Sequence, residues 1–273
     1  MKKTTLLFMF FLTFSMNAQI ITGKILSKEE QKPISYAKIV IADQNAGTIA
    51  DEKGNYKIDL TDINLKSNLK VEVGGFEKYV ISVEKLMKQT SHNILLIEKV
   101  SDIEEIKIDP KKYVRKNWGI NTKTTKIQIG HRPSMDQKDQ SKEIAMLFKT
   151  NKKTKIEKIN INISSFETDK PVFIRFTVYD KNLNSVLNED ITDEITKDKI
   201  IDGTYSFDIS QNNIWVNTDF YVGIQLLNYF EGRFYMSGAL MGNKTIYRNY
   251  SETWEKVPMV SPSINIDVRV QKN

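Results

Sequence analysis

The stretch ITGKILSKEEQKPISYAKIVIADQNAGTIADEKGNYKIDL, residues 21–60, decides the fold of the first part of the chain. It consists of short runs rich in Ile and Val, separated by Gly, Pro, Asn and Asp, which favour turns. Apolar residues alternate with polar ones in YAKIVIA (36–42) and in NYKIDL (55–60). This alternation predicts β-strands that bury one face and expose the other.

The loop before the second of these runs has two interpretations, a turn or an ion site. Within GTIADEKGNYK (47–57), Asp51 opens a four-residue connection that Gly54 closes, and Gly favours the positive φ that ends such a turn. A calcium loop counted from Asp51 would need an oxygen ligand where Lys53 stands. The sequence therefore predicts a structural turn and no metal ligand. The residues assigned to this turn are Gly47, Asp51, Gly54 and Tyr56.

Further strand-like runs follow at similar spacing up to residue 108. The seven runs are 20–26, 36–42, 55–60, 69–73, 78–83, 93–97 and 103–108. Seven short strands separated by turn residues predict a small β-sandwich. The segment KLMKQ at 85–89 predicts a single helical turn.

These residues resemble the carboxypeptidase regulatory-like domain. The resemblance rests on the glycine in the first strand, on PISYAKIVI, on GTIADEKGNY and on GGFE, which follow in the order typical of that family. It covers residues 19–108 and implies a seven-stranded, transthyretin-like or Ig-like sandwich. In that family the domain commonly precedes the plug of TonB-dependent receptors or accompanies secreted proteins. LIEKVSDIEEIKIDP (96–110) is similar to the stretch that leads into such a plug.

The catalytic site of zinc carboxypeptidases is not expected here. That site needs a His-x-x-Glu pair and a distant His, because a catalytic zinc takes three protein ligands. The two histidines are His92 and His131, and the third residue after each is Leu95 and Ser134. The chain contains no Cys, which excludes disulfides and a thiol nucleophile. We therefore expect no catalytic residue, no metal and no cofactor.

The first residues have the layout of a secretory signal peptide. Lys2 and Lys3 precede an apolar run from Leu6 to Phe14, and Ala18 stands before the expected cut. A membrane anchor is disfavoured because a spanning helix needs about 20 apolar residues. We expect residues 1–18 to be removed and the mature chain to reach the periplasm, the outer-membrane surface or the medium of a Gram-negative bacterium.

The remainder of the chain is predicted to be a second β-sandwich, of jelly-roll-like form, over residues 126–273, joined to the first by a linker at 109–125. The predicted fold class is therefore all-β throughout. The strand-like runs of this second part are 143–149, 155–164, 172–180, 204–210, 219–227, 232–238 and 263–270. The polar stretch 181–203 is expected to connect two of them.

Two sites in this part carry motif-like spacing without the full motif. DKNLNSVLNEDI (180–191) places Asp180, Asn182 and Asn184 at the spacing of calcium ligands, but its sixth and twelfth residues are Ser and Ile. A turn is therefore expected. His131 has no GxSxG elbow to accompany it, so we expect a structural histidine.

Aromatic residues gather between residues 229 and 254 together with Arg and Asn. Flat aromatic faces stack on sugar rings, and amides and guanidinium groups bind hydroxyls. The candidate ligand-binding residues are Tyr247, Tyr250, Trp254 and Arg233. The alternative is that several of these aromatics belong to the core, because strand alternation sends neighbours to opposite faces.

The function that these features favour is an exported, non-catalytic binding or structural module of the bacterial cell envelope. Its expected partner is an envelope protein or a glycan, and no transmembrane segment is expected in the mature chain. The net charge is +6, or +4 once Lys2 and Lys3 are removed, which is mild. Nucleic acid is disfavoured because the lysines are scattered and the chain is expected to be exported. One alternative is a carbohydrate-binding accessory protein that uses the C-terminal aromatics. Another is a hydrolase with a carboxylate pair across the second sandwich.

Overall fold

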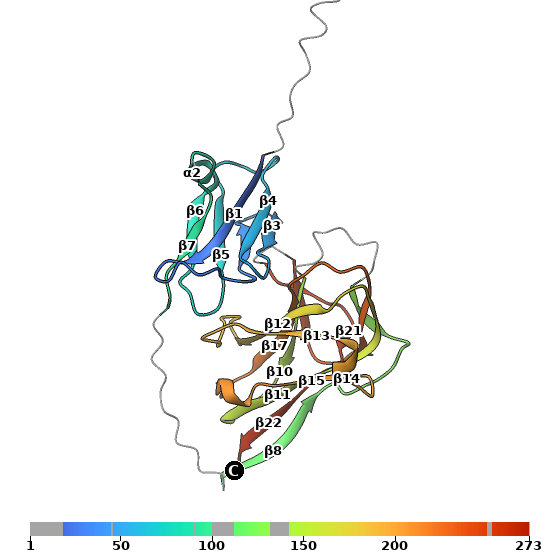
Figure 1. Cartoon of the computed structure of the whole chain (residues 1–273). Helices are drawn as coiled ribbons and strands as arrows, with labels where there is room; N and C mark the ends of the chain where they lie inside the picture. The colour runs from blue at the N-terminus through green and yellow to red at the C-terminus, as the bar shows by residue number, and fades with distance from the viewer. Residues whose placement is uncertain are drawn as a thin grey trace, which may run out of the picture.

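A computed structural model gives the architecture of the chain (Figure 1). The residues that it describes are 19–44, 46–89, 91–99, 112–131, 142–249 and 253–272. Strands make up nearly all of the regular structure, in two parts that lie against one another. The all-β prediction is therefore confirmed, whereas the predicted signal peptide at 1–18 and the strand predicted at 103–108 lie outside the described residues.

The N-terminal part is a sandwich of two sheets. One sheet has the strand order β4-β1-β7 and the other β3-β2-β5-β6. The strands are β1 (Ile20–Ser27), β2 (Lys38–Ile41), β3 (Ala46–Ile49), β4 (Asn55–Asp59), β5 (Asn68–Glu72), β6 (Tyr79–Ser82) and β7 (Ile94–Leu96). Strand β1 pairs antiparallel with β4 and parallel with β7, so it forms the centre of its sheet.

The core of this sandwich comes from the alternation seen in the sequence. Both predicted apolar faces are buried. Their residues are Ala37, Ile39, Ile41, Tyr56, Ile58 and Leu60. Helix α2 (Val83–Met87) starts two residues before the predicted helical turn, because the Ser82 hydroxyl accepts a hydrogen bond from Lys85 N and caps it.

The turn between β3 and β4 is held by the Asp51 side chain. Its Oδ1 accepts hydrogen bonds from the backbone N–H groups of Lys53 and Asn55, both at 2.8 Å. Gly54 has φ +74°, and a Cβ at this position would lie 2.7 Å from the carbonyl oxygen of Ile25. A side chain is therefore excluded at Gly54 by both the backbone conformation and the neighbouring strand.

The other two residues assigned to this turn lie in the flanking strands. Gly47 is in β3, opposite Val40 of β2. Tyr56 is the second residue of β4, and its buried ring ends in a hydroxyl that donates to the carbonyl oxygen of His92 at 2.6 Å.

The C-terminal part is a larger sandwich. One sheet has the order β13-β12-β17-β10-β19-β20. Its strands are β10 (Glu143–Phe148), β12 (Val172–Asp180), β13 (Ile191–Ile195), β17 (Phe220–Leu226), β19 (Thr245–Arg248) and β20 (Glu255–Lys256). We call this sheet the six-stranded sheet.

The facing sheet follows the path β14-β15-β11-β18-β21, with β16, β22, β8 and β9 attached to it. Its strands are β8 (Tyr113–Gly119), β9 (Gln128–His131), β11 (Thr154–Thr168), β14 (Ile200–Ile201), β15 (Thr204–Asp208), β16 (Trp215–Val216), β18 (Gly232–Leu240), β21 (Val260–Pro262) and β22 (Ile264–Gln271). Short 3-10 turns, η3 (Lys197–Lys199) and η4 (Ser210–Asn212), lie in the connections. Apolar side chains from both sheets form one shared core, which is why the two sheets pack face to face.

The predicted linker at 109–125 is wrong over much of its length. Strand β8 lies within that range and pairs antiparallel with β22 from Tyr113 to Gly119. The strand was missed because YVRKNWG has no alternating apolar face, and most of its side chains are exposed or half-buried. Its place in the sheet follows from its backbone hydrogen bonds to β22, which local sequence does not specify.

Candidate ligand-binding pocket

Four polar side chains form a row across the outer face of the six-stranded sheet. Arg175 of β12 lies opposite Gln225 of β17, Gln225 lies opposite Glu143 of β10, and Glu143 lies opposite Arg248 of β19. Strand alternation sends their apolar neighbours, such as Ile174, into the core. The outer face of a sheet is normally solvated, yet Arg175, Gln225 and Glu143 are 6%, 2% and 1% exposed. The row is therefore covered.

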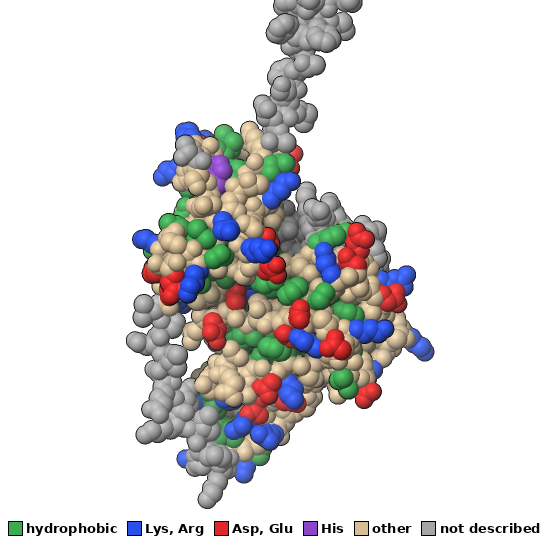
Figure 2. Space-filling model, viewed as in Figure 1, with side chains coloured by type: hydrophobic (Ala, Val, Ile, Leu, Met, Phe, Trp, Pro, Cys, Tyr) green, Lys and Arg blue, Asp and Glu red, His purple; other side chains and the backbone are tan. Residues whose placement is uncertain are grey.

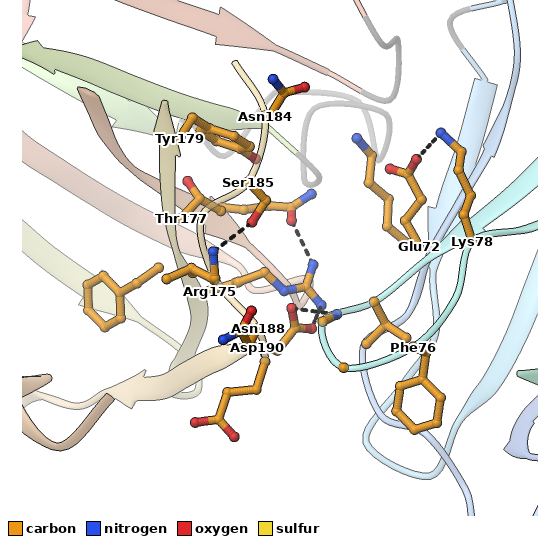
Figure 3. Close-up of a pocket in the computed structure, with 18 of the residues that line it drawn as sticks. Glu72, Phe76, Lys78, Arg175, Thr177, Tyr179, Asn184, Ser185, Asn188 and Asp190 are labelled. Carbon is orange, nitrogen blue, oxygen red and sulfur yellow. Dashed lines mark hydrogen bonds and ion pairs between the residues drawn. The ribbon is translucent and has the colours of Figure 1, made fainter. Parts of the chain in front are cut away.

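The N-terminal sandwich lies over one end of this row. Arg175 donates from Nη1 to Gln225 Oε1 at 2.8 Å and from Nη2 to the carbonyl oxygen of Tyr36 at 2.7 Å. Its Nη2 also pairs with Asp190 Oδ2 at 2.7 Å, and Asp190 Oδ1 accepts from the backbone N–H of Gly74 at 2.9 Å. Figure 3 shows Arg175 and Asp190 at the junction of the two parts. Polar contacts thus connect the sandwiches.

The other end of the row is a closed hydrogen-bonded cluster. Glu143 accepts from the Tyr179 hydroxyl at 2.5 Å and from Arg248 Nε at 2.7 Å, and Arg248 Nη2 donates to the Tyr179 oxygen at 2.9 Å. Burial acts to raise the pKa of Glu143, but Arg248, Lys38 and the Tyr179 hydroxyl outweigh it, so this pKa lies below its ordinary value. Glu143 is therefore a carboxylate whose charge is fully compensated.

Lys38 faces this cluster from the N-terminal sandwich. It lies in β2 opposite Glu72, is 4% exposed, and its Nζ has no hydrogen-bond partner among the described residues. Burial lowers its pKa from 10.5 to about 8, and Arg248 adds to the effect, while Glu143 and Glu72 partly offset it. A buried lysine without a hydrogen-bond acceptor is costly, so this position needs an explanation other than stability.

These groups surround a pocket of about 470 Å³ between the two sandwiches. Its walls are the β2–β5 face and the 72–78 segment on one side, and β12 with the 183–190 loop on the other. The lining is mostly polar: Lys38, Glu72, Lys78, Arg175, Thr177, Asn184, Ser185, Asn188, Asp190, Gln225 and Arg248, with Phe76, Tyr179 and Leu187 as the larger apolar surfaces. Figure 2 shows positive and negative side chains interspersed over both sandwiches on the face in view, so that face carries no single-sign patch.

The aromatic residues predicted to bind a ligand are only partly brought together. Tyr247 in β19 donates from its hydroxyl to Glu255 Oε2 at 2.6 Å, and Lys142 Nζ lies 5.0 Å from its ring centroid. Trp254, just before β20, packs edge-on against Tyr179, with ring centroids 5.5 Å apart. The guanidinium of Arg248 lies 4.4 Å from its centroid. Both rings are therefore already engaged by neighbouring side chains.

The remaining predicted residues lie elsewhere. Arg233 is exposed in β18, which belongs to the facing sheet, opposite Glu167. It is therefore in a different sheet from Tyr247. Tyr250 lies outside the described residues.

The other two sites considered in the second part of the chain are the loop that begins at Asp180 and His131. Asp180 Oδ1 accepts from the backbone N–H groups of Asn182 and Asn184, at 2.8 and 2.9 Å. This is the same arrangement as in the turn at Asp51, and the fourth residue, Leu183, likewise has a positive φ of 68°. His131 ends β9, where its backbone pairs with Phe234, and its side chain is outside the described part.

The sequence carried a signal for the pocket that the motifs did not reveal. Lys38, Arg175 and Gln225 are polar residues flanked on both sides by apolar ones in the strand-like runs YAKIVIA, VFIRFTVYD and DFYVGIQLL. Such isolated polar residues indicate a strand whose outer face is also buried. Which groups meet across that second buried face depends on packing between distant segments.

The described part of the chain has neither a metal-binding cluster nor a membrane-spanning helix. Within the described ranges, no group of three or more His, Asp and Glu side chains lies together as a metal ion would require. No helix in these ranges is long and apolar enough to cross a bilayer.

Comparison with solved structures gives weak likenesses to chains of infectious bursal disease virus. The T13 viral particle, the VP2 subviral particle and the Gx strain share 10%, 10% and 11% sequence identity with this chain, each with a TM-score of 0.28. The alignments cover 93% of this chain and 62%, 64% and 60% of the viral chains. This chain thus spans less than two thirds of each viral chain, and TM-scores of this size do not indicate a shared fold.

Comparison with sequence families is more specific. No curated protein matches the chain. The family model of the CarboxypepD_reg-like domain matches residues 21–108. These residues form the seven-stranded sandwich that carries Tyr36, Lys38 and Gly74, which line or contact the pocket. The N-terminal part of this chain, residues 21–108, is therefore a CarboxypepD_reg-like domain.

Proposed function

We propose that this protein is an exported, non-catalytic binding module of the bacterial cell envelope, and that its ligand occupies the pocket between the two sandwiches. The observation that carries the proposal is the buried Nζ of Lys38, which has no hydrogen-bond partner in the described part of the chain and lies on the wall of a 470 Å³ pocket. Pockets of about 300–1,000 Å³ with a few convergent polar groups are typical of ligand sites. A β-sandwich of the CarboxypepD_reg-like family is consistent with such a role.

The pairing of the buried carboxylates supports binding over catalysis. Glu143 accepts from both Tyr179 and Arg248, and Asp190 from both Arg175 and the backbone of Gly74. A general acid needs a raised pKa, whereas the pKa of Glu143 is lowered. These carboxylates are arranged to hold cations in place, which suits a rigid binding site.

The export part of the proposal rests on the N-terminal sequence, with Lys2 and Lys3 before an apolar run and Ala18 before the cut. Expression of the full chain in a Gram-negative host, followed by fractionation and intact-mass measurement, tests it. We expect a chain that begins at Gln19 in the periplasm, the outer-membrane fraction or the medium. An uncut chain retained in the cytoplasm would contradict export.

The role of the pocket in binding can be tested with a variant whose larger side chain fills it. Asn188 lines the pocket and is exposed, so Asn188→Trp adds a large ring there at little cost to the fold. Lys57→Trp on the exposed edge of β4 is the matched control. The mature protein and both variants are applied to arrays of envelope glycans and peptides and to envelope extracts. We expect the wild type and Lys57→Trp to retain the same ligands and Asn188→Trp to lose them; equal retention by all three would place binding elsewhere.

A further inference from the structure

The pocket has two buried cationic donors that no described residue satisfies. Lys38 Nζ and Arg175 Nε have no hydrogen-bond partner among the described residues, and their residues are 4% and 6% exposed. The other two nitrogens of the Arg175 guanidinium are bound to Gln225, Tyr36 and Asp190, so its plane is fixed. A guanidinium held in this way points its free Nε–H in a defined direction.

Among the described residues, the charges around the pocket leave one positive charge without a counter-ion. Two buried cations are paired, Arg175 with Asp190 and Arg248 with Glu143, both at 2.7 Å. Lys38 is the third. The acidic groups that act on it are Glu143 and Glu72.

Both of those carboxylates already bind another cation. Glu143 holds Arg248, and Glu72 forms an ion pair with Lys78 of the same sandwich. The remaining charged lining residues, Lys99 and Glu189, are exposed, and solvent screens them. Counted over the described residues, the pocket therefore carries an excess of one positive charge.

The two free donors lie beside hydroxyl and amide groups. Thr177 is two residues after Arg175 on β12, so both side chains project from the same face of the sheet. Asn184, Ser185 and Asn188 line the same wall from the neighbouring loop. Figure 3 shows these residues grouped on one side of the pocket and Phe76 on the other.

A single excess charge with separate ammonium and guanidinium N–H donors matches a carboxylate, which carries one negative charge on two oxygens. A phosphate dianion has more charge and more acceptor oxygens than this pocket compensates. The surrounding hydroxyl and amide groups suit a ligand with further polar groups. The pocket volume of about 470 Å³ sets its size at that of a small molecule.

We propose that the pocket binds a polar small molecule through its carboxylate, which accepts hydrogen bonds from Lys38 Nζ and Arg175 Nε. This inference rests on the proposed function, because it takes the pocket as the ligand site. Two sources share the chemistry: an acidic sugar, and the free C-terminus of a short peptide.

Isothermal titration of the mature protein at pH 7 with matched probe pairs tests the proposal. D-galacturonate is compared with D-galactose, and acetyl-Ala-Ala with its C-terminal amide; inorganic phosphate is a fifth probe. We expect at least one of the two carboxylates to bind and its neutral counterpart to bind at least about tenfold more weakly. The pair that responds identifies the source.

Lys38→Met removes the charge and keeps the length of the side chain, and Lys57→Met on β4 is the control. We expect Lys38→Met to weaken carboxylate binding by about 30-fold or more and Lys57→Met to leave it unchanged. Lys38→Met should not unfold the protein, because it replaces a buried, unpaired charge with an apolar side chain. A loss of binding in this variant is therefore due to the missing ammonium group.

Three results would overturn the carboxylate assignment: no carboxylate bound by the wild type, phosphate bound in place of both carboxylates, or unchanged affinity in Lys38→Met. None of these results bears on export. If the protein captures another ligand and Asn188→Trp abolishes that capture, the proposed binding function still holds. If the folded wild-type protein binds neither a carboxylate nor any ligand from the arrays and extracts, the proposed function is wrong as well.

Discussion

The guanidinium of Arg175 and the carboxylate of Asp190 lie 2.7 Å apart, and each also bonds to the backbone of the N-terminal sandwich. Arg175 donates to the carbonyl oxygen of Tyr36, and Asp190 accepts from the N–H of Gly74. The rings of Tyr36 and Phe173, with centroids 5.7 Å apart, add an apolar contact beside them. A buried ion pair defines geometry better than it adds stability, so this pair sets how the two sandwiches meet.

Removal of the Asp190 side chain should therefore destabilise the protein strongly. Asp190→Ala leaves Arg175 buried with its charge unpaired and leaves the Gly74 N–H without its acceptor. We expect the free energy of unfolding to fall by about 3–5 kcal/mol. Urea denaturation measures it, with Asp62→Ala, at an exposed site, expected within about 0.5 kcal/mol of wild type. A loss below about 1 kcal/mol for Asp190→Ala would show that the pair does not join the sandwiches.

Unlike Asp190, the charged side chain of Lys38 should lower the stability of the protein. Its folded pKa of about 8 lies below the value of 10.5, so the protonated form is disfavoured by folding. Between these two pH values the unfolded chain binds more protons, and the contribution of this residue to stability rises with pH. Below pH 8 the full penalty applies.

Lys38→Met should therefore raise the free energy of unfolding at pH 7 by about 2–4 kcal/mol. The difference between variant and wild type should shrink from pH 8 toward pH 10.5. Denaturant titrations at pH 7, 8, 9 and 10 measure both effects. A destabilised variant, or a difference that is constant with pH, would contradict a buried lysine with a lowered pKa.

Gly74 is expected to tolerate no side chain. A Cβ there would lie 2.3 Å from the backbone nitrogen of Asp190 and 2.5 Å from the carbonyl carbon of Glu189, both across the junction. Gly74→Ala should separate the 183–190 loop from the N-terminal sandwich, which faster hydrogen exchange of that loop would report. Gly75→Ala is the control for backbone strain, because its φ is +84° but its added Cβ meets only Asn188 O, at 3.8 Å. Equal exchange in both variants would argue against a clash at Gly74.

In the turn at Asp51, two variants test the backbone conformation and the side-chain hydrogen bonds separately. Gly54→Val introduces a Cβ 2.7 Å from Ile25 O at φ +74°, so we expect a loss of about 3 kcal/mol or more. Asp51→Ala removes an exposed cap of two backbone N–H groups and should cost about 1 kcal/mol. Thermal melts with and without calcium measure both. Calcium-dependent stabilisation that Asp51→Ala abolishes would instead establish an ion site.

Local sequence was sufficient for much of the N-terminal sandwich. The turn residues Asp51 and Gly54 and the alternation of Ile39 with Lys38 are short-range features, and they predicted strands and faces in the right places. The same alternation assigned Lys38 to solvent. It is buried because the second sandwich covers the outer face of β2, and no short-range pattern specifies which distant segment does so.

The same limit explains the two other errors of expectation. Strand β8 was taken for linker because its partner, β22, is about 150 residues away, and pairing at that distance leaves no local signature in an exposed edge strand. Arg248 was noted among the polar residues beside the aromatics but was not chosen as a candidate ligand-binding residue. Its role depends on Glu143, which lies more than 100 residues earlier in the chain.

The two bonds that join the sandwiches end on main-chain atoms of the N-terminal domain, the carbonyl of Tyr36 and the amide of Gly74. Main-chain atoms persist through most substitutions, so these two hydrogen bonds depend on the backbone of the N-terminal domain and on side chains of the C-terminal sandwich. Substitutions in the N-terminal domain that leave Gly74 a glycine should therefore preserve both hydrogen bonds. A related sandwich with the same backbone could replace it by recombination and bring a different residue to position 38, on the wall of the proposed ligand pocket.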